Sequence, residues 1–400
     1  MNKLTNKLTD TSDKRPMGIY IHWPYCLSKC PYCDFNSHIG TEIDDKRWIN
    51  AFIKALGHYA HILKNRQVVS IFFGGGTPSL MPVNLVEEIL DEIHRLAGYL
   101  PDEITLEANP TSVERDKFKS FSNAGITRVS LGVQALNTHD LKFLGREHSV
   151  KDALKALEIA KENFTRTSFD LIYARPGQIK QDWEVELKRA LEFCPDHMSL
   201  YQLTIEPQTP FYIRYKRGEF DIPTQEEAAL LYETTEDITS QNGLLSYEVS
   251  NYAKKEQECR HNLVYWLGQD YIGIGPGAHG RFYNEDMQHW TGTRHHRSPD
   301  IWLDKTSEHG NGAETCEVVS SQERDQEIVM MGLRLKDGID LNHLDNPGKT
   351  VRLSALETLE KEGYLIKDQS NIRLTPSGRL VLDAVLDYIL PAIPAEEFAA

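Results

Sequence analysis

The sequence lacks the features that mark membrane-spanning, secreted and nucleic-acid-binding proteins. No run of about 18 apolar residues occurs, so we expect no membrane-spanning helix. Lys and Arg number 44 against 59 Asp and Glu, and the net charge of −15 argues against a broad nucleic-acid-binding surface. Residues 1–15 contain no apolar stretch of the kind that a secretory signal needs, and they are predicted to form a flexible polar tail. These absences together favour a cytoplasmic protein.

Cysteine is also scarce, which argues against a disulfide framework. The chain has 6 cysteines in 400 residues, and three of them, Cys194, Cys259 and Cys316, stand alone in the sequence. A reducing compartment fits this pattern better than an oxidising one.

The other three cysteines, Cys26, Cys30 and Cys33, form a C-x3-C-x2-C pattern after an apolar run. An ordinary 4Fe–4S cluster takes four protein sulfurs, so three thiolates suit a cluster with one iron left open. An open metal position is where chemistry takes place in catalytic metal sites. A zinc site would favour a second cysteine pair, which the sequence lacks. Three unconnected core thiols are the remaining alternative, and the dense spacing of the cysteines argues against it.

Six strand-like runs, separated by helical patterns, dominate residues 16–220. Several of the runs are continuously apolar or β-branched, as in strands that are covered on both faces. They span residues 18–23, 68–73, 103–108, 128–133, 168–173 and 197–203. Alternating β and α units predict a parallel sheet, either doubly wound or barrel-like. Glycines or polar residues lie at or near the ends of these runs. Because barrel sites collect at the carboxyl ends of strands, we favour an α/β fold with a partial (β/α)6 barrel.

Different patterns follow the barrel. Residues 221–306 are predicted to form an α+β extension, which begins with a capping box at Thr224 and Glu227. The polar residues 307–319 are interpreted as a linker. Residues 320–390 then show the order of helix, short hairpin and helix that is typical of a winged helix. Acidic and basic residues nearly balance there, so we expect this module to serve packing or partner docking, not DNA binding.

The cysteine loop resembles the signature of the radical S-adenosylmethionine superfamily, and the resemblance extends over most of residues 16–300. In that superfamily the open iron binds the amino and carboxylate groups of S-adenosylmethionine, and a transferred electron yields a 5′-deoxyadenosyl radical. Further family motifs are matched by Gly74-Gly75-Gly76-Thr77-Pro78 and by Glu107 in Leu-Glu-Ala-Asn-Pro, while Tyr32 matches an aromatic that packs against adenine. The resemblance implies that S-adenosylmethionine contacts Tyr20, Tyr32, Gly75, Gly76, Thr77, Glu107, Gln134, Arg146 and Asp170.

Several of these residues also have plainer interpretations. A glycine-rich turn by itself is usually only a tight turn, although here it comes one β/α unit after the cysteines. Glu107 fits a helix cap or a solvated carboxylate, and Arg146 fits an ordinary surface arginine. Asp170 lies within an apolar strand, where a buried acid needs a partner.

Within the superfamily, the chain is similar to the oxygen-independent coproporphyrinogen III oxidase group. True oxidases carry a further cysteine, in the pattern C-x3-C-x2-C-x-C, where this chain has Phe35. HemW-type haem chaperones have phenylalanine there and carry a His-Asn-x-x-Tyr-Trp motif, which runs here from His261 to Trp266. The resemblance implies an axial bond from His261 to haem iron, with Tyr265 and Trp266 against the porphyrin face. Without the family context, His261 would be interpreted as a satisfied histidine beside two core aromatics. His279 is a further candidate for the pocket, with an ordinary loop histidine as the alternative.

The resemblance implies a haem chaperone that binds haem and a 4Fe–4S cluster with S-adenosylmethionine. Such a protein transfers haem to apo-haemoproteins, including membrane-bound respiratory proteins. It would be cytoplasmic with peripheral membrane association, and a homodimer stays open. The alternative is an oxygen-independent coproporphyrinogen III oxidase, a radical enzyme of porphyrin biosynthesis, so whether the chain is an enzyme also stays open. A radical methyltransferase and a zinc-stabilised interaction protein are weaker alternatives.

One position departs from the family pattern. The family usually has Tyr-Gly-Leu-Pro after the fifth strand, whereas this chain has Tyr173-Ala174-Arg175-Pro176. Alanine cannot replace a glycine at positive φ without strain. Either the freedom of that glycine is not needed or the loop is displaced, and Arg175 is expected to add a charge near the cavity.

Overall fold

Six parallel strands form the centre of the computed structural model, which describes residues 14–40, 43–193 and 195–391. In chain order and in spatial order they are β1 (Arg15–Trp23), β4 (Arg66–Gly75), β5 (Ile104–Ala108), β6 (Arg128–Gln134), β7 (Arg166–Tyr173) and β8 (His197–Gln202). Nearly every residue of β4 is buried, as expected for a strand that is covered on both faces. The predicted partial (β/α)6 barrel is confirmed. Residues 1–13 of the predicted polar tail lie outside the described residues, and Arg15 already belongs to β1.

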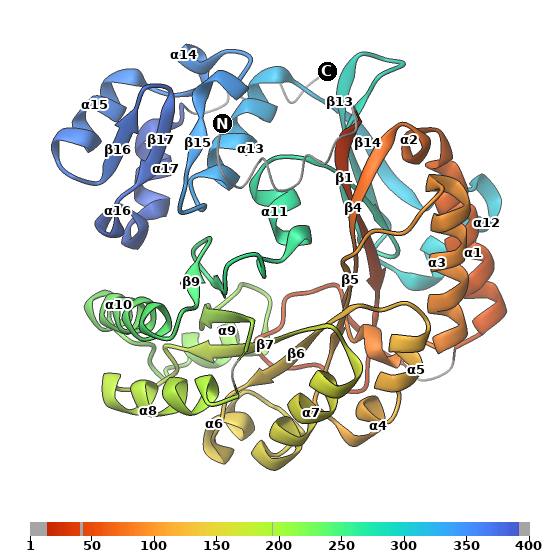
Figure 1. Cartoon of the computed structure of the whole chain (residues 1–400), viewed down its shortest axis with the longest axis horizontal. Helices are drawn as coiled ribbons and strands as arrows, with labels where there is room; N and C mark the ends of the chain where they lie inside the picture. The colour runs from red at the N-terminus through yellow and green to blue at the C-terminus, as the bar shows by residue number, and fades with distance from the viewer. Residues whose placement is uncertain (1–13, 41–42, 194, 392–400) are drawn as a thin grey trace.

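Helices follow the strands, and most of them cover the outer side of the curved sheet (Figure 1). They are α1 (Asp45–His58), α2 (Ala60–Lys64), α3 (Val83–Ala97), α4 (Ser112–Arg115), α5 (Phe118–Asn123), α6 (Thr138–Phe143), α7 (Val150–Asn163), α8 (Lys180–Leu191), α9 (Pro210–Lys216) and α10 (Gln225–Gln241), with the short 3-10 turn η2 (Pro78–Leu80). Helix α3 shows why they form: apolar side chains recur along one face and are buried against the sheet. It ends at Gly98, whose left-handed backbone closes the last turn.

The extension lengthens the same sheet at both edges to twelve strands. At one edge, β11 (Asp270–Ile274) pairs in parallel with β1, and β12 (His279–Asn284), β13 (His289–His295) and β14 (Ala313–Val319) follow antiparallel. At the other edge, β10 (Asn251–Ala253) pairs with β8, and β9 (Leu245–Ser246) pairs with β10. Helices α11 (Arg260–Trp266) and α12 (Pro299–His309) complete this part.

The predicted domain limits stay predictions. The prediction that residues 307–319 form a linker is wrong. Its first residues end α12, and residues 313–319 form β14, which pairs with β13 along most of its length. As an edge strand, β14 leaves most of its side chains exposed. It therefore carries a polar sequence that is hard to distinguish from a loop.

The C-terminal module forms a smaller layer with its own hydrophobic cluster. It comprises α13 (Ser321–Gly332), β15 (Ile339–Asp340), η3 (Leu341–His343), α14 (Pro347–Thr350), α15 (Leu353–Lys361), β16 (Leu365–Asp368), β17 (Asn371–Leu374), α16 (Pro376–Leu380) and α17 (Leu382–Ile389). Its strands pair antiparallel in the order β15-β17-β16, which gives the expected winged-helix-like arrangement. Two ion pairs connect the module to the rest of the chain. Arg379 pairs with Glu236 on α10, and Arg334 pairs with Glu248 between β9 and β10.

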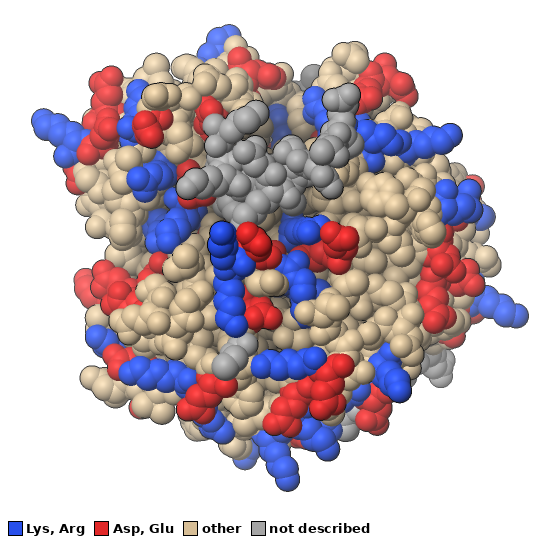
Figure 2. All heavy atoms as spheres, in the orientation of Figure 1, with Lys and Arg blue, Asp and Glu red and all other residues tan. Residues whose placement is uncertain are grey.

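Lys and Arg are interspersed with Asp and Glu on the face drawn in Figure 2. Within the described residues, every helix is too short or too polar to cross a membrane.

Candidate functional site

The three clustered cysteines lie in the loop that begins in β2 (Tyr25–Cys26) and leads to β3 (His38–Ile39). Cys26, Cys30 and Cys33 are half-buried and line one cavity of about 150 Å³ at the carboxyl ends of the barrel strands. Burial raises the pKa of both Cys26 and Cys33, and the neighbouring cysteine thiols add to the rise. The described residues contain no group of three His, Cys, Asp or Glu side chains close enough together to hold a single metal ion. Three thiolates on the wall of one cavity could hold three irons of a 4Fe–4S cluster and leave the fourth iron open.

Two cysteine sulfurs accept hydrogen bonds from residues at the strand ends. Thr77 Oγ1 donates to Cys26 Sγ at 3.3 Å, and Arg146 Nη1 donates to Cys30 Sγ at 3.3 Å. Asn109 joins the two donors, because its Nδ2 donates to Thr77 Oγ1 at 3.2 Å and its Oδ1 accepts from Arg146 Nη2. Asn109 is not among the residues predicted from the sequence. Its position two residues after Glu107, at the end of the same strand, was the available signal.

Gly75 at the end of β4 and Gly76 just after it are required by close packing. A Cβ atom at Gly76 would lie 2.7 Å from the backbone oxygen of Tyr25, so glycine lets β4 approach the cysteine loop. Gly75 has a φ of 114°, and a Cβ there would lie 2.6 Å from the His22 ring. Both glycines line the cluster cavity, together with Thr77. Glycine at these two positions therefore permits close packing between the strand end and the cysteine loop, and it also leaves space in the cavity.

Two carboxyl groups, those of Glu107 and Asp170, line this cavity. Burial raises the pKa of Glu107 to about 8, and the negative charge of Asp170 adds to the rise. Burial also raises the pKa of Asp170 to about 6, although Ser130 donates to its Oδ1 at 3.3 Å. The neutral form of Glu107 is therefore favoured at pH 7. A cationic group bound between the two carboxyls would reverse that preference.

Two buried polar atoms in the cavity wall have no hydrogen-bond partner among the described residues: Gln134 Oε1 and Arg146 Nε. Gln134 has a φ of 70°, and the register between β6 and β7 shifts just before it. Such strain is typical of functional sites. With one acceptor and one donor unused beside two carboxyls, the cavity suits a ligand that carries both amino and carboxylate groups.

The two tyrosines that the sequence assigns to S-adenosylmethionine lie apart. Tyr32 lines the cluster cavity and packs against Phe211 at a centroid distance of 6.2 Å. Tyr20 lies in a neighbouring cavity of about 310 Å³, where its hydroxyl is 3.0 Å from His22 Nδ1. The structure thus brings together all the predicted S-adenosylmethionine contacts except Tyr20, and the assignment itself stays a prediction.

The histidine of the His-Asn-x-x-Tyr-Trp motif is occupied by protein partners. His261 begins the motif on α11 and is 1% exposed. Hydrogen bonds join its Nδ1 to Ser70 Oγ and its Nε2 to the Tyr265 hydroxyl, both at 2.9 Å. Its ring stacks on Phe72 at 4.9 Å, and burial lowers its pKa to about 3. In this conformation both ring nitrogens are engaged, so an axial bond from His261 to haem iron would require one of these two hydrogen bonds to break.

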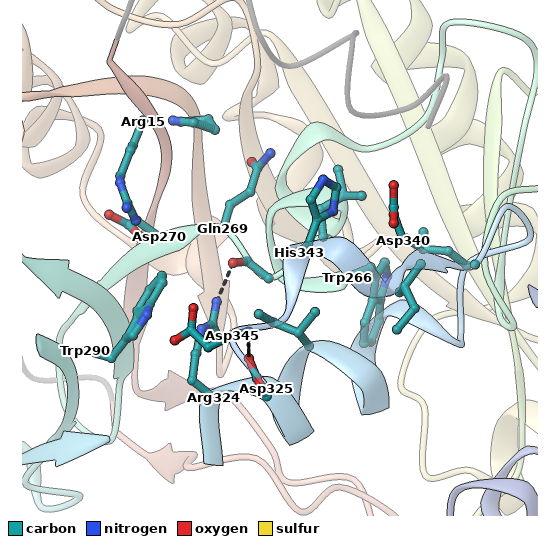
Figure 3. A pocket seen from close by; sticks show the side chains of 17 residues that line it. Arg15, Trp266, Gln269, Asp270, Trp290, Arg324, Asp325, Asp340, His343 and Asp345 are labelled. Carbon is teal, nitrogen blue, oxygen red and sulfur yellow. Dashed lines mark hydrogen bonds between the residues drawn. The ribbon is translucent and has the colours of Figure 1, made fainter. Parts of the chain in front are cut away.

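The other residues of the motif face two different cavities. Tyr265 lines the 310 Å³ cavity that also contains Tyr20 and His279. Trp266 lines a separate cavity of about 350 Å³ between β1, β13 and the C-terminal module, where Trp290 and Arg324 are further walls (Figure 3). Tyr265 and Trp266 therefore do not cover one porphyrin face together.

Ala174 and Arg175, which depart from the family pattern, are accommodated by the backbone conformation of one and the ion pairs of the other. Ala174 has a φ of 56°, so this loop keeps the left-handed backbone that glycine would adopt without strain. Arg175 does not place its charge in the cluster cavity. Its buried guanidinium pairs with Glu186 and, at 2.9 Å, with Asp140. The expectation of an added charge near the cavity is thus wrong, because two carboxylates on α6 and α8 hold Arg175 elsewhere.

The comparisons with known proteins agree with this geometry. Residues 20–190 match the radical SAM superfamily, and residues 319–381 match the HemN C-terminal domain. The solved structure of coproporphyrinogen III oxidase (HemN) from Escherichia coli superposes with a TM-score of 0.77 at 21% identity, over 94% of this chain and 90% of that chain. At that identity the likeness shows the shared fold.

Two curated relatives match nearly the full chain. The mitochondrial radical S-adenosyl methionine domain-containing protein 1 of Danio rerio is 35% identical over 400 residues, which cover 95% of this chain and 89% of the relative. The heme chaperone HemW of Escherichia coli (strain K12) is 34% identical over 383 residues, which cover 94% of this chain and 98% of the relative. The chain therefore belongs to the radical S-adenosylmethionine superfamily, in the family that includes the heme chaperone HemW.

Proposed function

We propose that this protein is a haem chaperone, which binds haem and passes it to acceptor haemoproteins. The observation that carries the proposal is the near-full-length likeness to the heme chaperone HemW, together with Phe35 in place of a fourth cysteine. Phe35 is 59% exposed and lines both the cluster cavity and the neighbouring cavity. An exposed aromatic at that position offers apolar contact to a flat ligand where a cysteine would offer another thiol.

The resident cofactors implied by the family are a 4Fe–4S cluster and S-adenosylmethionine. Cys26, Cys30 and Cys33 would hold the cluster, which with S-adenosylmethionine supplies one-electron chemistry when bound. Thr77 and Arg146 would stabilise the thiolate charge by donating to the sulfurs.

The remaining polar groups of the cavity would orient S-adenosylmethionine. The carboxyl of Glu107 would release its proton when a cationic amino group lies beside it, because the positive charge lowers its raised pKa. The unpaired Arg146 Nε would donate to a carboxylate, and Gln134 Oε1 would accept from an amino group.

The test is transfer of haem. The protein is reconstituted with iron and sulfide, loaded with haem and mixed with a purified b-type apo-cytochrome, whose own spectrum reports haem uptake. We expect stoichiometric haem binding and a transfer rate that depends on the acceptor concentration. A rate equal to that of spontaneous haem release, independent of the acceptor, would contradict a chaperone role.

A second candidate function is oxygen-independent oxidation of coproporphyrinogen III, favoured by the HemN-like fold and the intact cysteine triad. Incubation with coproporphyrinogen III, S-adenosylmethionine and a reductant distinguishes the two. Formation of protoporphyrinogen would support the oxidase, and its absence alongside haem transfer would support the chaperone. Metal analysis of anaerobically purified protein separates both from a zinc protein, since only a cluster brings sulfide with iron.

We further propose a cytoplasmic protein that meets membrane-bound acceptors at the membrane surface. Leu27, Phe35 and Ile39 in and near the cysteine loop are 46%, 59% and 70% exposed, and Phe35 lines the cluster cavity. Such side chains suit transient contact with an acceptor or a membrane edge. Flotation with lipid vesicles, compared for the parent chain and an Ile39→Ser variant, tests this part, and size-exclusion chromatography tests a homodimer.

A further inference from the structure

The cavity beside the cluster has the walls that a flat aromatic ligand needs. It holds about 310 Å³ and is bordered by Tyr20, Phe35, Tyr265 and Tyr271. Phe35, Gly75 and Glu107 line this cavity and the cluster cavity alike. A macrocycle seated here would pack against aromatic rings and lie directly beside the cluster.

His279 is the imidazole of this cavity that is free to bind a metal. His22 also lines it, but the ring of His22 is bonded to the Tyr20 hydroxyl at 3.0 Å and to the Asn36 oxygen at 2.9 Å. His261 lies behind Tyr265 with both ring nitrogens occupied. By contrast, the ring of His279 makes no hydrogen bond within the described part of the chain, and the residue is exposed at the first position of β12.

The surroundings of His279 favour a neutral ring and an anionic ligand. Partial burial lowers the pKa of His279, and the nearby positive charges of Arg294, Arg281 and Arg297 lower it further. Neutral imidazole is the form that binds haem iron. Arg294 pairs with Glu314 at 3.3 Å and Arg281 with Glu327 at 2.8 Å, whereas the guanidinium of Arg297 has no ion-pair partner among the residues described. The guanidinium of Arg297 therefore suits a carboxylate side group of a tetrapyrrole.

We propose that His279 is the axial ligand of the bound haem, which sits in this cavity against Tyr265 and Phe35, while His261 is a positioning residue that holds the Tyr265 hydroxyl. The proposal rests on the proposed function, since it names the place and the ligand of the same cargo.

The test is a haem titration of the full chain with its cluster reconstituted, followed by the Soret band and by the electron paramagnetic resonance signal of ferric haem. The variants are His279→Ala, His279→Asn, His261→Ala and the control His139→Ala, whose side chain is 91% exposed beyond the cavity. Circular dichroism establishes that each variant is folded. We expect both His279 variants to weaken haem binding by about tenfold or more, because changes outside the first ligand shell already cost that much. Added imidazole should restore the Soret band of His279→Ala.

His261→Ala should keep the ferric signal of histidine-ligated haem per folded molecule, although it should lower stability and shift the Soret band slightly through Tyr265. If both His279 variants bind haem as the parent does, and folded His261→Ala loses the histidine signature, the ligand assignment is overturned while the chaperone function stands. If the parent chain itself binds no stoichiometric haem, the assignment and the proposed function fail together.

Discussion

Glu103 is the buried anion that supports the start of α11. Its Oε2 lies 2.7 Å from Arg166 Nη1 and 3.5 Å from Arg128 Nη1, while its Oε1 accepts a hydrogen bond from the backbone N–H of His261 at 3.1 Å. Glu103 is fully buried and Arg128 is 2% exposed. A Glu103→Gln substitution keeps the shape of the side chain and removes its charge. It therefore leaves Arg128 buried without this counter-ion.

We expect Glu103→Gln to lower the free energy of unfolding by about 3–5 kcal/mol, which is the usual cost of removing one partner of a buried ion pair. A second route gives a similar value, since charge-assisted hydrogen bonds to Arg166 and to the His261 backbone contribute about 1.5–3 kcal/mol each. Urea unfolding followed by tryptophan fluorescence measures the change. The matched control is Glu308→Gln, because Glu308 is 57% exposed and pairs with Lys305 at 3.2 Å. The control should change stability by no more than about 1 kcal/mol.

The reasoning is refuted if Glu103→Gln and the control lose the same small amount. A further arm separates charge from volume. The double variant Glu103→Leu and Arg128→Met should recover part of the loss, since apolar residues of similar volume often replace a buried ion pair without cost.

Three further predictions concern single side chains of the site. In the ligand-free protein, Glu107 keeps its proton up to about pH 8 in the folded state, whereas the unfolded chain releases it near 4.5. Stability should thus fall as pH rises between these values, and Glu107→Gln should remove this part of the slope in thermal denaturation; an identical slope in the variant would contradict it. Ser70→Ala leaves the Nδ1 of His261 unpaired and should lower the free energy of unfolding by about 1–3 kcal/mol, and a loss below a few tenths in urea titrations would argue against that bond. Thr77→Val removes the donor to Cys26 and should make the cluster potential more negative, because hydrogen bonds to the sulfurs stabilise the reduced cluster; equal potentials in a redox titration would show that the bond is lost when the cluster is present.

The barrel was predictable because its strands are long, apolar and regularly spaced by amphipathic helices. The cysteine triad could be recognised as a candidate cluster site because its three thiols are close in sequence. Edge strand β14 was not, since exposure on the sheet edge allows Ala313–Val319 to be almost as polar as a loop. Hydrophobic periodicity in a sequence reflects which side chains are buried, so it does not reveal a strand whose side chains are mostly exposed.

The site was predictable in its positions but less so in its contacts. The strand ends indicated Thr77 and Glu107, and both line the cluster cavity, whereas the position of Asn109 becomes significant only through its contacts with Thr77 and Arg146. His261 shows the opposite case. The motif marks the residue, but the partners that occupy its nitrogens, Ser70 and Tyr265, become visible only in three dimensions. Arg175 likewise has carboxylate partners on two helices that no local pattern reveals.

The wall that the two cavities share has a thermodynamic consequence. Because Phe35, Gly75 and Glu107 border both spaces, an occupant of one space can change the rotamer of Phe35 and the charge of Glu107 that the other space presents. Any factor by which S-adenosylmethionine alters the affinity for cargo must then equal the factor by which cargo alters the affinity for S-adenosylmethionine. The protein with bound cargo should consequently differ from the cargo-free protein in its affinity for S-adenosylmethionine, even if S-adenosylmethionine is never cleaved.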